Sequence, residues 1–217
     1  MKRILLLTTG GTIASRETDE GLAPGLDGNM LAHYLGGLAD SYDLTVRDIM
    51  RLDSSNIQPE EWRLIARHVY DARNDFDGIV ISHGTDTMAY TASVLSYMVL
   101  GIPIPVVLTG AQLPIEHPLT DGVDNLRTAF AMAASGRPGV FLAFNRKVML
   151  GCRAVKTHTT DFGAFDSVNW PLAATVSGSG LTVRDETIPR YDGPCVLRDR
   201  LCEDVFLIKL TPGLNPE

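Results

Sequence analysis

The sequence predicts an α/β protein with a three-layer, doubly wound sheet whose strands are mainly parallel. Short apolar runs of strand length alternate along the chain with longer segments that carry apolar residues at helical spacing. This alternation is typical of a parallel sheet covered by helices on both faces. Two of the apolar runs end in Gly-Thr turns, and in such sheets ligands bind at the carboxyl ends of the strands.

The first elements follow directly from the amino terminus. Residues 3–8 are a continuous apolar run, which fits a central strand buried on both faces. Residues 16–28 are polar, rich in glycine and without periodicity, so we expect a mobile loop there. A helix over 30–38 and a strand over 44–52 complete this part of the predicted sheet.

The next helix has a clear start signal. Pro59 suits the first position of a helix, and Glu60 and Glu61 favour the positive end of the helix dipole. Apolar residues then recur at i, i+3, i+4, i+7 and i+8, namely Trp62, Ile65, Ala66, Val69 and Tyr70. This spacing predicts a helix that buries one face.

Strands and helices continue to alternate after this helix. We expect strands over 77–82, 104–108 and 140–144, and helices over 87–100 and 121–134. The 87–100 helix is apolar on most of its faces, so more than the sheet should cover it.

The end of the chain departs from this pattern. Residues 185–204 are rich in proline and glycine with little periodicity, and indicate a linker. The apolar run at 205–210 predicts a strand. We therefore divide the chain into a domain over 1–184, a linker over 185–204, and residues 205–217, which would hold the first strand of a C-terminal domain that is otherwise absent.

Composition restricts the class of protein. The 217 residues are 45% hydrophobic and 21% charged, as in a soluble globular protein with a large core. The net charge is −7 and no Lys/Arg cluster exceeds a pair, which argues against a nucleic-acid partner. No apolar stretch is long enough for a membrane span, and the first run is too short for a signal peptide. We expect a cytoplasmic protein without a membrane partner.

The metal-binding residue types indicate no site. Cys152, Cys195 and Cys202 are odd in number and lack metal-ligand spacing, as expected for thiols in a reducing compartment. The histidines also lack ligand spacing. We therefore expect no metal and no cofactor.

Hydroxyl groups follow two glycine turns at the ends of apolar runs. Thr12 follows Gly10-Gly11, and Thr85 follows Gly84. A buried strand that breaks at such a turn leaves backbone N–H groups free. Together with Lys156, which can serve as a base when it is desolvated, these turns indicate a catalytic site built on hydroxyls.

Each candidate residue has a commoner structural interpretation when taken alone. A threonine after glycine often caps a helix, and Asp86 at a helix start complements the dipole. Ser54 and Ser55 are typical of a turn. Taken alone, Lys156 is typical of a solvated surface charge. His83 is interpreted as structural, because the chemistry needs no imidazole.

Several segments resemble the signature segments of bacterial-type L-asparaginases, and the resemblance covers essentially all of the chain. The longer matches end in Thr9-Gly10-Gly11-Thr12-Ile13-Ala14 and His83-Gly84-Thr85-Asp86-Thr87-Met88. Shorter matches in the same order are Asp53-Ser54-Ser55, Thr109-Gly110-Ala111-Gln112 and Lys156-Thr157. The Asp53-Ser54-Ser55 segment and the missing signal peptide look more like the cytoplasmic type I branch than the periplasmic type II branch.

The resemblance implies a Rossmann-like asparaginase N-terminal domain that hydrolyses L-asparagine to L-aspartate and ammonia. By similarity, Thr12 is the nucleophile that forms an acyl-enzyme. Thr85, Asp86 and Lys156 then form a second catalytic cluster, in which the lysine acts as base and Thr85 activates water or relays protons.

The resemblance also implies the substrate-binding residues, which are Gly11, Asp53, Ser54, Ser55, Thr85, Asp86 and Ala111. Asp86 would hold the substrate α-ammonium, and Ser54 and Ser55 its α-carboxylate. Ala111 would contact the leaving amide through its backbone, and N–H groups near Gly11 and Thr85 would receive the oxyanion. The partner is then a small-molecule substrate, and the full-length protein is expected to be a homodimer or homotetramer.

One departure from the family keeps other functions open. The family loop carries a tyrosine that contacts the nucleophile, but this chain has Leu22, which cannot move a proton. Family members also complete each site with the C-terminal domain of a neighbouring subunit, so we expect the chain alone to be a poor catalyst. The alternatives are the amidase subunit of a glutamyl-tRNA amidotransferase, and a catalytically silent amino-acid-binding module.

Overall fold

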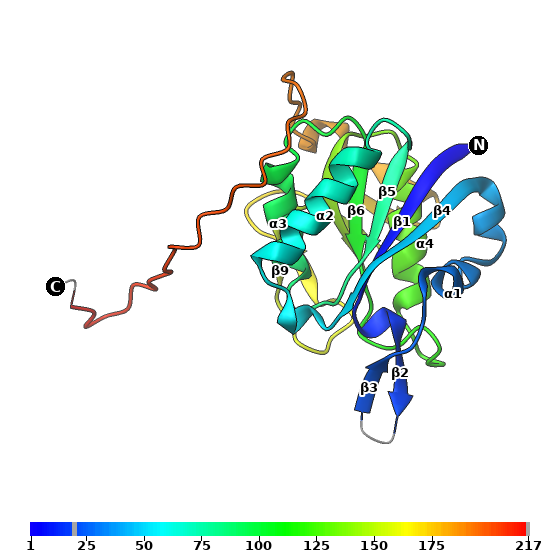
Figure 1. The fold of residues 1–217 in the computed structure, drawn as a ribbon, viewed down its shortest axis with the longest axis horizontal. Helices are drawn as coiled ribbons and strands as arrows, with labels where there is room; N and C mark the ends of the chain where they lie inside the picture. The colour runs from blue at the N-terminus through cyan, green and yellow to red at the C-terminus, as the bar shows by residue number, and fades with distance from the viewer. Residues whose placement is uncertain (19–20, 216–217) are drawn as a thin grey trace.

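The computed structural model describes residues 1–18 and 21–215. In this part of the chain an eight-stranded sheet forms the centre (Figure 1), with the spatial order β12 (Gly180–Val183), β11 (Ala174–Ser177), β8 (Lys147–Leu150), β7 (Gly139–Phe144), β6 (Pro105–Thr109), β5 (Gly78–Ser82), β1 (Lys2–Gly10) and β4 (Tyr42–Leu52). Along the sheet, the neighbouring strands β4, β1, β5, β6 and β7 pair parallel. The remaining pairs, β7 with β8, β8 with β11 and β11 with β12, are antiparallel.

Helices cover both faces of this sheet. Helices α2 (Pro59–Ala72) and α3 (Met88–Met98) lie on one face, and α1 (Gly28–His33) and α4 (Gly122–Ala133) on the other (Figure 1). Alternate residues of β1 enter the two cores, because successive side chains of a strand point to opposite faces. The prediction of a three-layer, doubly wound, mainly parallel sheet is confirmed.

Most of the predicted elements are present, with small shifts at their ends. Pro59 begins α2, and Glu61 Oε2 accepts a hydrogen bond from the Gln58 N–H at 2.8 Å, which caps the helix. The first predicted helix is shorter than expected. It ends at His33, and the chain continues as the 3-10 helix η2 (Gly36–Ser41), in which Gly36 has a φ of +57° that an α-helix does not accept.

The connections of the central strands create a ligand-binding crevice. From β1 the chain crosses to β4 on one side, and from β5 it crosses to β6 on the other side. Adjacent strands whose connections leave in opposite directions form a topological switch point, and ligands bind there, outside the carboxyl ends of the strands. The two Gly-Thr turns follow these two strands.

The expected mobile loop at 16–28 contains a hairpin instead. Strands β2 (Ser15–Thr18) and β3 (Gly21–Pro24) pair antiparallel, with Ser15 opposite Pro24. These residues lack the alternating apolar pattern of a half-buried strand, which is why no strand was predicted for them. Leu22 lies in β3, but its side chain is outside the part of the structure that is described.

The strands after residue 145 were not predicted. Besides β8, β11 and β12 they include a separate hairpin of β9 (Ala154–Lys156) and β10 (Phe165–Ser167). Each has three or four residues, which is too short for hydrophobic periodicity to identify. Strand β9 is important because Lys156 is its last residue.

The predicted linker packs against the α2 and α3 layer for part of its length. Arg67 forms an ion pair of 2.9 Å with Asp199, and the side chains of Cys195, Leu197 and Leu201 contact the core on this face. The 3-10 helix η4 (Asp185–Thr187) opens this segment.

Residues 205–210 form no strand in the described chain, and their assignment as the first strand of a C-terminal domain stays a prediction. Phe206 is 87% exposed and Leu207 90% exposed, and the segment extends away from the body of the molecule (Figure 1). A strand needs a neighbour to receive its hydrogen bonds, and none of the described strands lies beside these residues. The division into domains stays a prediction. None of the described helices combines the length and the apolar character that crossing a membrane requires.

Candidate active site

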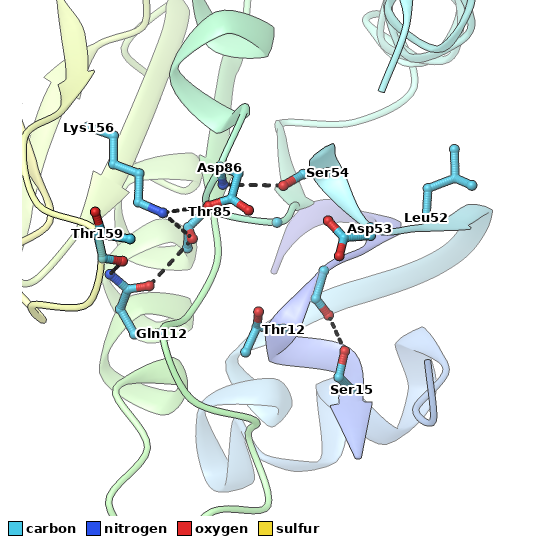
Figure 2. Close-up of a pocket in the computed structure, with 12 residues that line it drawn as sticks. Thr12, Ser15, Leu52, Asp53, Ser54, Thr85, Asp86, Gln112, Lys156 and Thr159 are labelled. Carbon is cyan, nitrogen blue, oxygen red and sulfur yellow. Dashed lines mark hydrogen bonds and ion pairs between the residues drawn. The ribbon is translucent and has the colours of Figure 1, made fainter. Parts of the chain in front are cut away.

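A cavity of about 200 Å³ opens at the carboxyl ends of β1 and β5 (Figure 2). It is lined by Gly11, Thr12, Ser15, Leu52, Asp53, Ser54, Gly84, Thr85, Asp86, Gln112, Lys156 and Thr159. These residues come from turns that are far apart in the sequence. The crevice predicted from the strand order is therefore where the candidate residues gather.

Glycines allow the turns to approach one another. Gly11 has a φ of +82°, and a Cβ there would overlap with Gly84 Cα. A Cβ on Gly84 would lie 2.5 Å from Ser54 Oγ. Both positions need glycine because neighbouring atoms occupy the space of a side chain. The Gly11 N–H donates to the Leu52 carbonyl at 3.1 Å, which fixes the first turn against the end of β4.

Thr12 begins the 3-10 helix η1 (Thr12–Ala14) at the wall of the cavity. Its side chain is half-buried and faces the cavity in Figure 2. Within residues 1–18 and 21–215, its hydroxyl has no hydrogen-bond partner. The predicted nucleophile is thus accessible to a ligand in the cavity.

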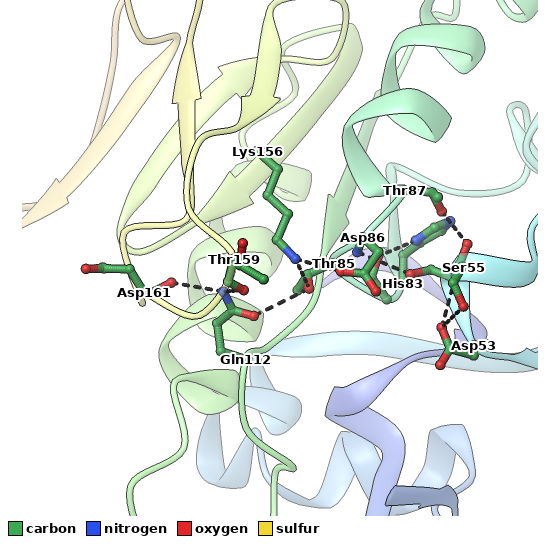
Figure 3. Close-up of polar contacts among 12 residues, drawn as sticks. Asp53, Ser55, His83, Thr85, Asp86, Thr87, Gln112, Lys156, Thr159 and Asp161 are labelled. Atoms are coloured by element: carbon green, nitrogen blue, oxygen red, sulfur yellow. Dashed lines mark hydrogen bonds and ion pairs between the residues drawn. The ribbon is translucent and has the colours of Figure 1, made fainter.

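Lys156 reaches the cavity from the opposite side and contacts both members of the second cluster. Its Nζ donates to Thr85 Oγ1 at 2.9 Å and to Asp86 Oδ1 at 2.8 Å (Figure 3). The Lys156 side chain is only 16% exposed, whereas that of Asp86 is 59% exposed. The geometry therefore disagrees with the interpretation of Lys156 as a solvated surface charge.

Gln112 is a cavity residue that the sequence interpretation did not assign. Its Nε2 donates to the carbonyl oxygens of Thr159 and Asp161, both at 3.0 Å. This leaves Oε1 facing Thr85 Oγ1, at 3.4 Å. Gln112 thus ties the loop after β9 to the turn after β6. The residue lies in the matched Thr-Gly-Ala-Gln segment, but nothing in the sequence shows which carbonyls its amide meets.

The Asp53-Ser54-Ser55 segment lies beside the first turn, in the 3-10 helix η3 (Ser54–Asn56) and its cap. Asp53 Oδ1 accepts from both the N–H and the hydroxyl of Ser55 at 2.9 Å (Figure 3). Ser54 Oγ accepts from the Asp86 N–H at 3.2 Å, and Ser54 O from the Thr87 hydroxyl at 2.7 Å. Asp53 and Ser54 line the cavity, whereas the Ser55 hydroxyl is engaged with the Asp53 carboxylate that caps the turn.

Ala111 lies behind the cavity wall. It is 1% exposed and its side chain packs in the core with α4. The turn around it is held by Asp121, whose carboxylate accepts from the Gln112 N–H at 3.0 Å, and by Asn125, which donates to Gly110 O at 2.9 Å. The structure therefore brings Gln112 to the cavity and leaves Ala111 to act through its backbone alone.

The charged side chains of the cavity wall are Lys156, Asp53 and Asp86. Among residues 1–18 and 21–215, no group of three or more His, Cys, Asp or Glu side chains is arranged to hold a metal ion. The arrangement suits chemistry by hydroxyl groups and backbone N–H donors.

The comparisons with known proteins agree with this site. The family model described as "Asparaginase, N-terminal" matches residues 3–189. The chain belongs to the asparaginase family. The L-asparaginase of Thermococcus kodakarensis is 46% identical in an alignment of 217 positions that covers 99% of this chain and 66% of that protein. The solved structure of the thermostable L-asparaginase from this organism superposes with a TM-score of 0.90, covering 99% of this chain and 65% of that chain.

More distant asparaginase-family relatives carry two different names. L-asparaginase 1 of Escherichia coli K12 is 33% identical, with 100% of this chain and 65% of that protein covered. A glutamyl-tRNA(Gln) amidotransferase subunit of Methanosphaera stadtmanae is 34% identical, with 100% of this chain and 52% of that protein covered. The chain thus spans from about half to about two thirds of the length of these relatives. The predicted resemblance to type I-like asparaginases is confirmed.

Proposed function

We propose that the protein carrying this chain hydrolyses L-asparagine to L-aspartate and ammonia through an acyl-enzyme on Thr12. One observation carries the proposal: the Thr12 hydroxyl, which has no partner among the described residues, and the Lys156-bound Thr85 hydroxyl line the same cavity. Amide hydrolysis by a threonine needs a nucleophile, a route for its proton and donors for the oxyanion. The L-asparaginase names of two relatives support the choice of substrate.

In the first half of the proposed reaction, Thr12 Oγ1 attacks the side-chain amide carbon of asparagine. The C=O π pair moves to oxygen, where the backbone N–H groups near Gly11 and Thr85 stabilise the negative charge. The nucleophile's proton passes to the nitrogen that leaves as ammonia. An aspartyl ester on Thr12 remains.

In the second half, water attacks this ester and releases aspartate. The Thr85 hydroxyl and Lys156, 2.9 Å apart, offer the route for the proton of this water. A lysine that has lost its proton beside a hydroxyl can take the proton of that hydroxyl, which in turn accepts one from water. The proton returns to Thr12 Oγ1 as the ester bond breaks.

Substrate recognition is assigned to Asp86 and to the Asp53-Ser54-Ser55 segment. Asp86 is more exposed than its partner Lys156, and its carboxylate would pair with the α-ammonium. Ser54, whose Oγ accepts from the Asp86 N–H, can donate its own proton to the α-carboxylate. Ser55 and Asp53 would support this subsite by holding the η3 turn, because they bond to each other at 2.9 Å.

The direct test is to trap the acyl-enzyme. The full-length protein is mixed with asparagine, quenched in acid within its first turnovers and digested for mass spectrometry. We expect an aspartyl ester on the peptide that contains Thr12. An ester on the Thr85 peptide instead, or ammonia release with no adduct on either peptide, contradicts the role of Thr12.

A second candidate is an amidase subunit that supplies ammonia for charged glutamyl-tRNA. The 34% identity to the amidotransferase relative favours it. The two candidates differ in how ammonia release depends on RNA. Release from free asparagine without RNA supports the first, whereas release that requires glutamyl-tRNA supports the second.

A third candidate is a silent module that binds amino acids without reaction. The presence of Leu22 where the family has a loop tyrosine favours it. Calorimetry distinguishes this candidate, since aspartate or asparagine would bind without any release of ammonia. The expected homodimer or homotetramer and the cytoplasmic location stay predictions.

A further inference from the structure

His83 lies directly before the Thr85 turn, and the reaction proposed above does not use it. Its side chain is completely buried and does not line the cavity. Both ring nitrogens nevertheless have partners: Nδ1 lies 2.8 Å from the Gly84 carbonyl oxygen, and Nε2 lies 2.9 Å from Thr91 Oγ1 on α3. A buried ring held at both ends has a fixed orientation.

The partners determine where the ring proton is. A carbonyl oxygen only accepts hydrogen bonds, so Nδ1 carries the proton that it donates to Gly84. Burial lowers the pKa of His83 to about 4, so the ring is neutral at neutral pH and Nε2 is an acceptor. The Thr91 hydroxyl therefore donates to Nε2.

A tryptophan supports this direction from the other end. Trp62 Nε1, which can only donate, lies 2.9 Å from Thr91 Oγ1. The hydrogen bonds thus run in one direction, from Trp62 to Thr91, from Thr91 to His83, and from His83 to the Gly84 carbonyl. Reversing any one of them would leave two donors or two acceptors facing each other.

The Gly84 carbonyl belongs to the peptide that also contains the Thr85 N–H. This peptide is trans, since the described chain has no cis bonds, so its C=O and N–H point in opposite directions. The carbonyl faces the buried His83, and the N–H therefore faces the cavity side. Within the described residues, the Thr85 N–H has no hydrogen-bond partner, although Thr85 is only 6% exposed.

We propose that His83 is a positioning residue that holds the Gly84–Thr85 peptide so that the Thr85 N–H is a fixed donor to the oxyanion. The proposal rests on the proposed hydrolysis. Glycine at position 84 is required by the contact with Ser54, but it leaves the backbone free to rotate. A donor contributes most to catalysis when it needs no reorientation during the reaction, and the His83 ring prevents that rotation.

Two variants test the two ring nitrogens of His83 one at a time. In His83→Asn the side-chain amide replaces Nδ1 and keeps the donor to Gly84. In His83→Gln the longer side chain replaces Nε2 and keeps only the contact with Thr91. We expect His83→Gln to lower kcat roughly 10²-fold with little change in KM, as for the loss of one oxyanion donor. His83→Asn should retain most of kcat. Equal kcat values for both variants and the wild type overturn the proposal.

A second pair covers the case in which His83 variants do not fold. Thr91→Ser keeps the hydroxyl that sets the ring, and Thr91→Val removes it at nearly equal volume. We expect Thr91→Val to lower kcat with KM nearly constant, and Thr91→Ser to keep a kcat near that of the wild type. If both variants have the kcat of the wild type, His83 does not act through this hydrogen-bond chain.

The tautomer gives a readout that does not depend on activity. Nitrogen-15 NMR of the imidazole in the full-length protein should show a protonated Nδ1 and an unprotonated Nε2. A ring protonated on Nε2 overturns the proposal even if the enzyme is active. Conversely, a protein without ammonia release but with the expected tautomer, and with a Thr85 amide resonance that shifts in His83→Gln but not in His83→Asn, contradicts the hydrolysis and retains the positioning role.

Discussion

The two Gly-Thr turns occupy equivalent places at the ends of β1 and β5, yet their hydroxyls have opposite surroundings. Thr85 is 6% exposed and bonds to Lys156 Nζ at 2.9 Å. The half-buried Thr12 hydroxyl has no partner among the described residues. Buried hydroxyls almost always have partners, so a hydroxyl left unpaired at a cavity wall is available to a substrate. The difference supports the proposed roles of the two hydroxyls, a proton relay in the Thr85 turn and a nucleophile in the Thr12 turn.

The largest expected effect comes from removing the unpaired hydroxyl. Thr12→Ala should abolish ammonia release from asparagine in the full-length protein, because no other group would form the acyl-enzyme. Thr12→Ser, the matched control, should retain part of the activity. A steady-state ammonia assay with thermal melting curves checks this, and an alanine variant with a near-normal rate would remove Thr12 from the mechanism.

The next effect comes from the partner of the second hydroxyl. Lys156→Met keeps most of the volume but cannot transfer a proton, so kcat should fall roughly 10²–10⁴-fold with a much smaller change in KM. Lys156→Arg is the control, because arginine keeps a positive charge beside Asp86 but cannot act as a base. If the kcat of Lys156→Arg is close to that of the wild type, the positive charge and not proton transfer explains the effect of Lys156.

A third prediction concerns the pH dependence of stability. His83 has a pKa of about 4 in the folded chain, lowered from 6.5 by burial. Between pH 6.5 and pH 4, His83 binds a proton in the unfolded chain but stays neutral in the folded chain. The free energy of unfolding therefore falls as the pH drops from 6.5 to 4. The loss attributable to His83 is about 3 kcal/mol.

The measurement is urea unfolding of the wild type and His83→Asn at several pH values between 7 and 4. The asparagine variant lacks the titrating ring, so its stability should decline less over this range. Parallel curves for the two proteins would mean that His83 is protonated in the folded state as easily as in the unfolded state.

The smallest effect is expected at Gln112. Its weak contact with Thr85 Oγ1, at 3.4 Å, orients a hydroxyl that Lys156 already holds. Gln112→Ala should therefore lower kcat by about tenfold, because it frees the loop after β9 and loses one hydrogen bond. Gln112→Asn is the control, since it keeps the amide but is too short to bridge both sides. A loss as large as that of Lys156→Met would make Gln112 an essential part of the relay.

Strands β1, β5, β6 and β7 could be predicted because strands buried on both faces leave continuous apolar runs in the sequence. β5, for example, is completely buried over its length. The short strands after residue 145 carry no such run, so β9 and its place beside α3 were not predicted. The hairpin of β2 and β3 was missed because its residues also lack an apolar pattern.

The candidate site was predicted in part, and its contacts were not. Gly11, Thr12, Thr85 and Lys156 were identified from glycine turns and from the resemblance, and all line one cavity. The orientation of Gln112 depends on the carbonyl of Thr159, 47 positions away. Such long-range pairings follow from the tertiary fold and have no local pattern in the sequence.

The exposed residues at 205–210 affect how the chain behaves in concentrated solution. Val-Phe-Leu-Ile-Lys-Leu has high strand propensity, a single charge and no proline. Phe206 and Leu207 are 87% and 90% exposed. Segments of this composition stack with identical copies as intermolecular cross-β strands. The chain by itself should therefore aggregate as its concentration rises, and any domain or subunit that covers this segment also acts as its solubility factor.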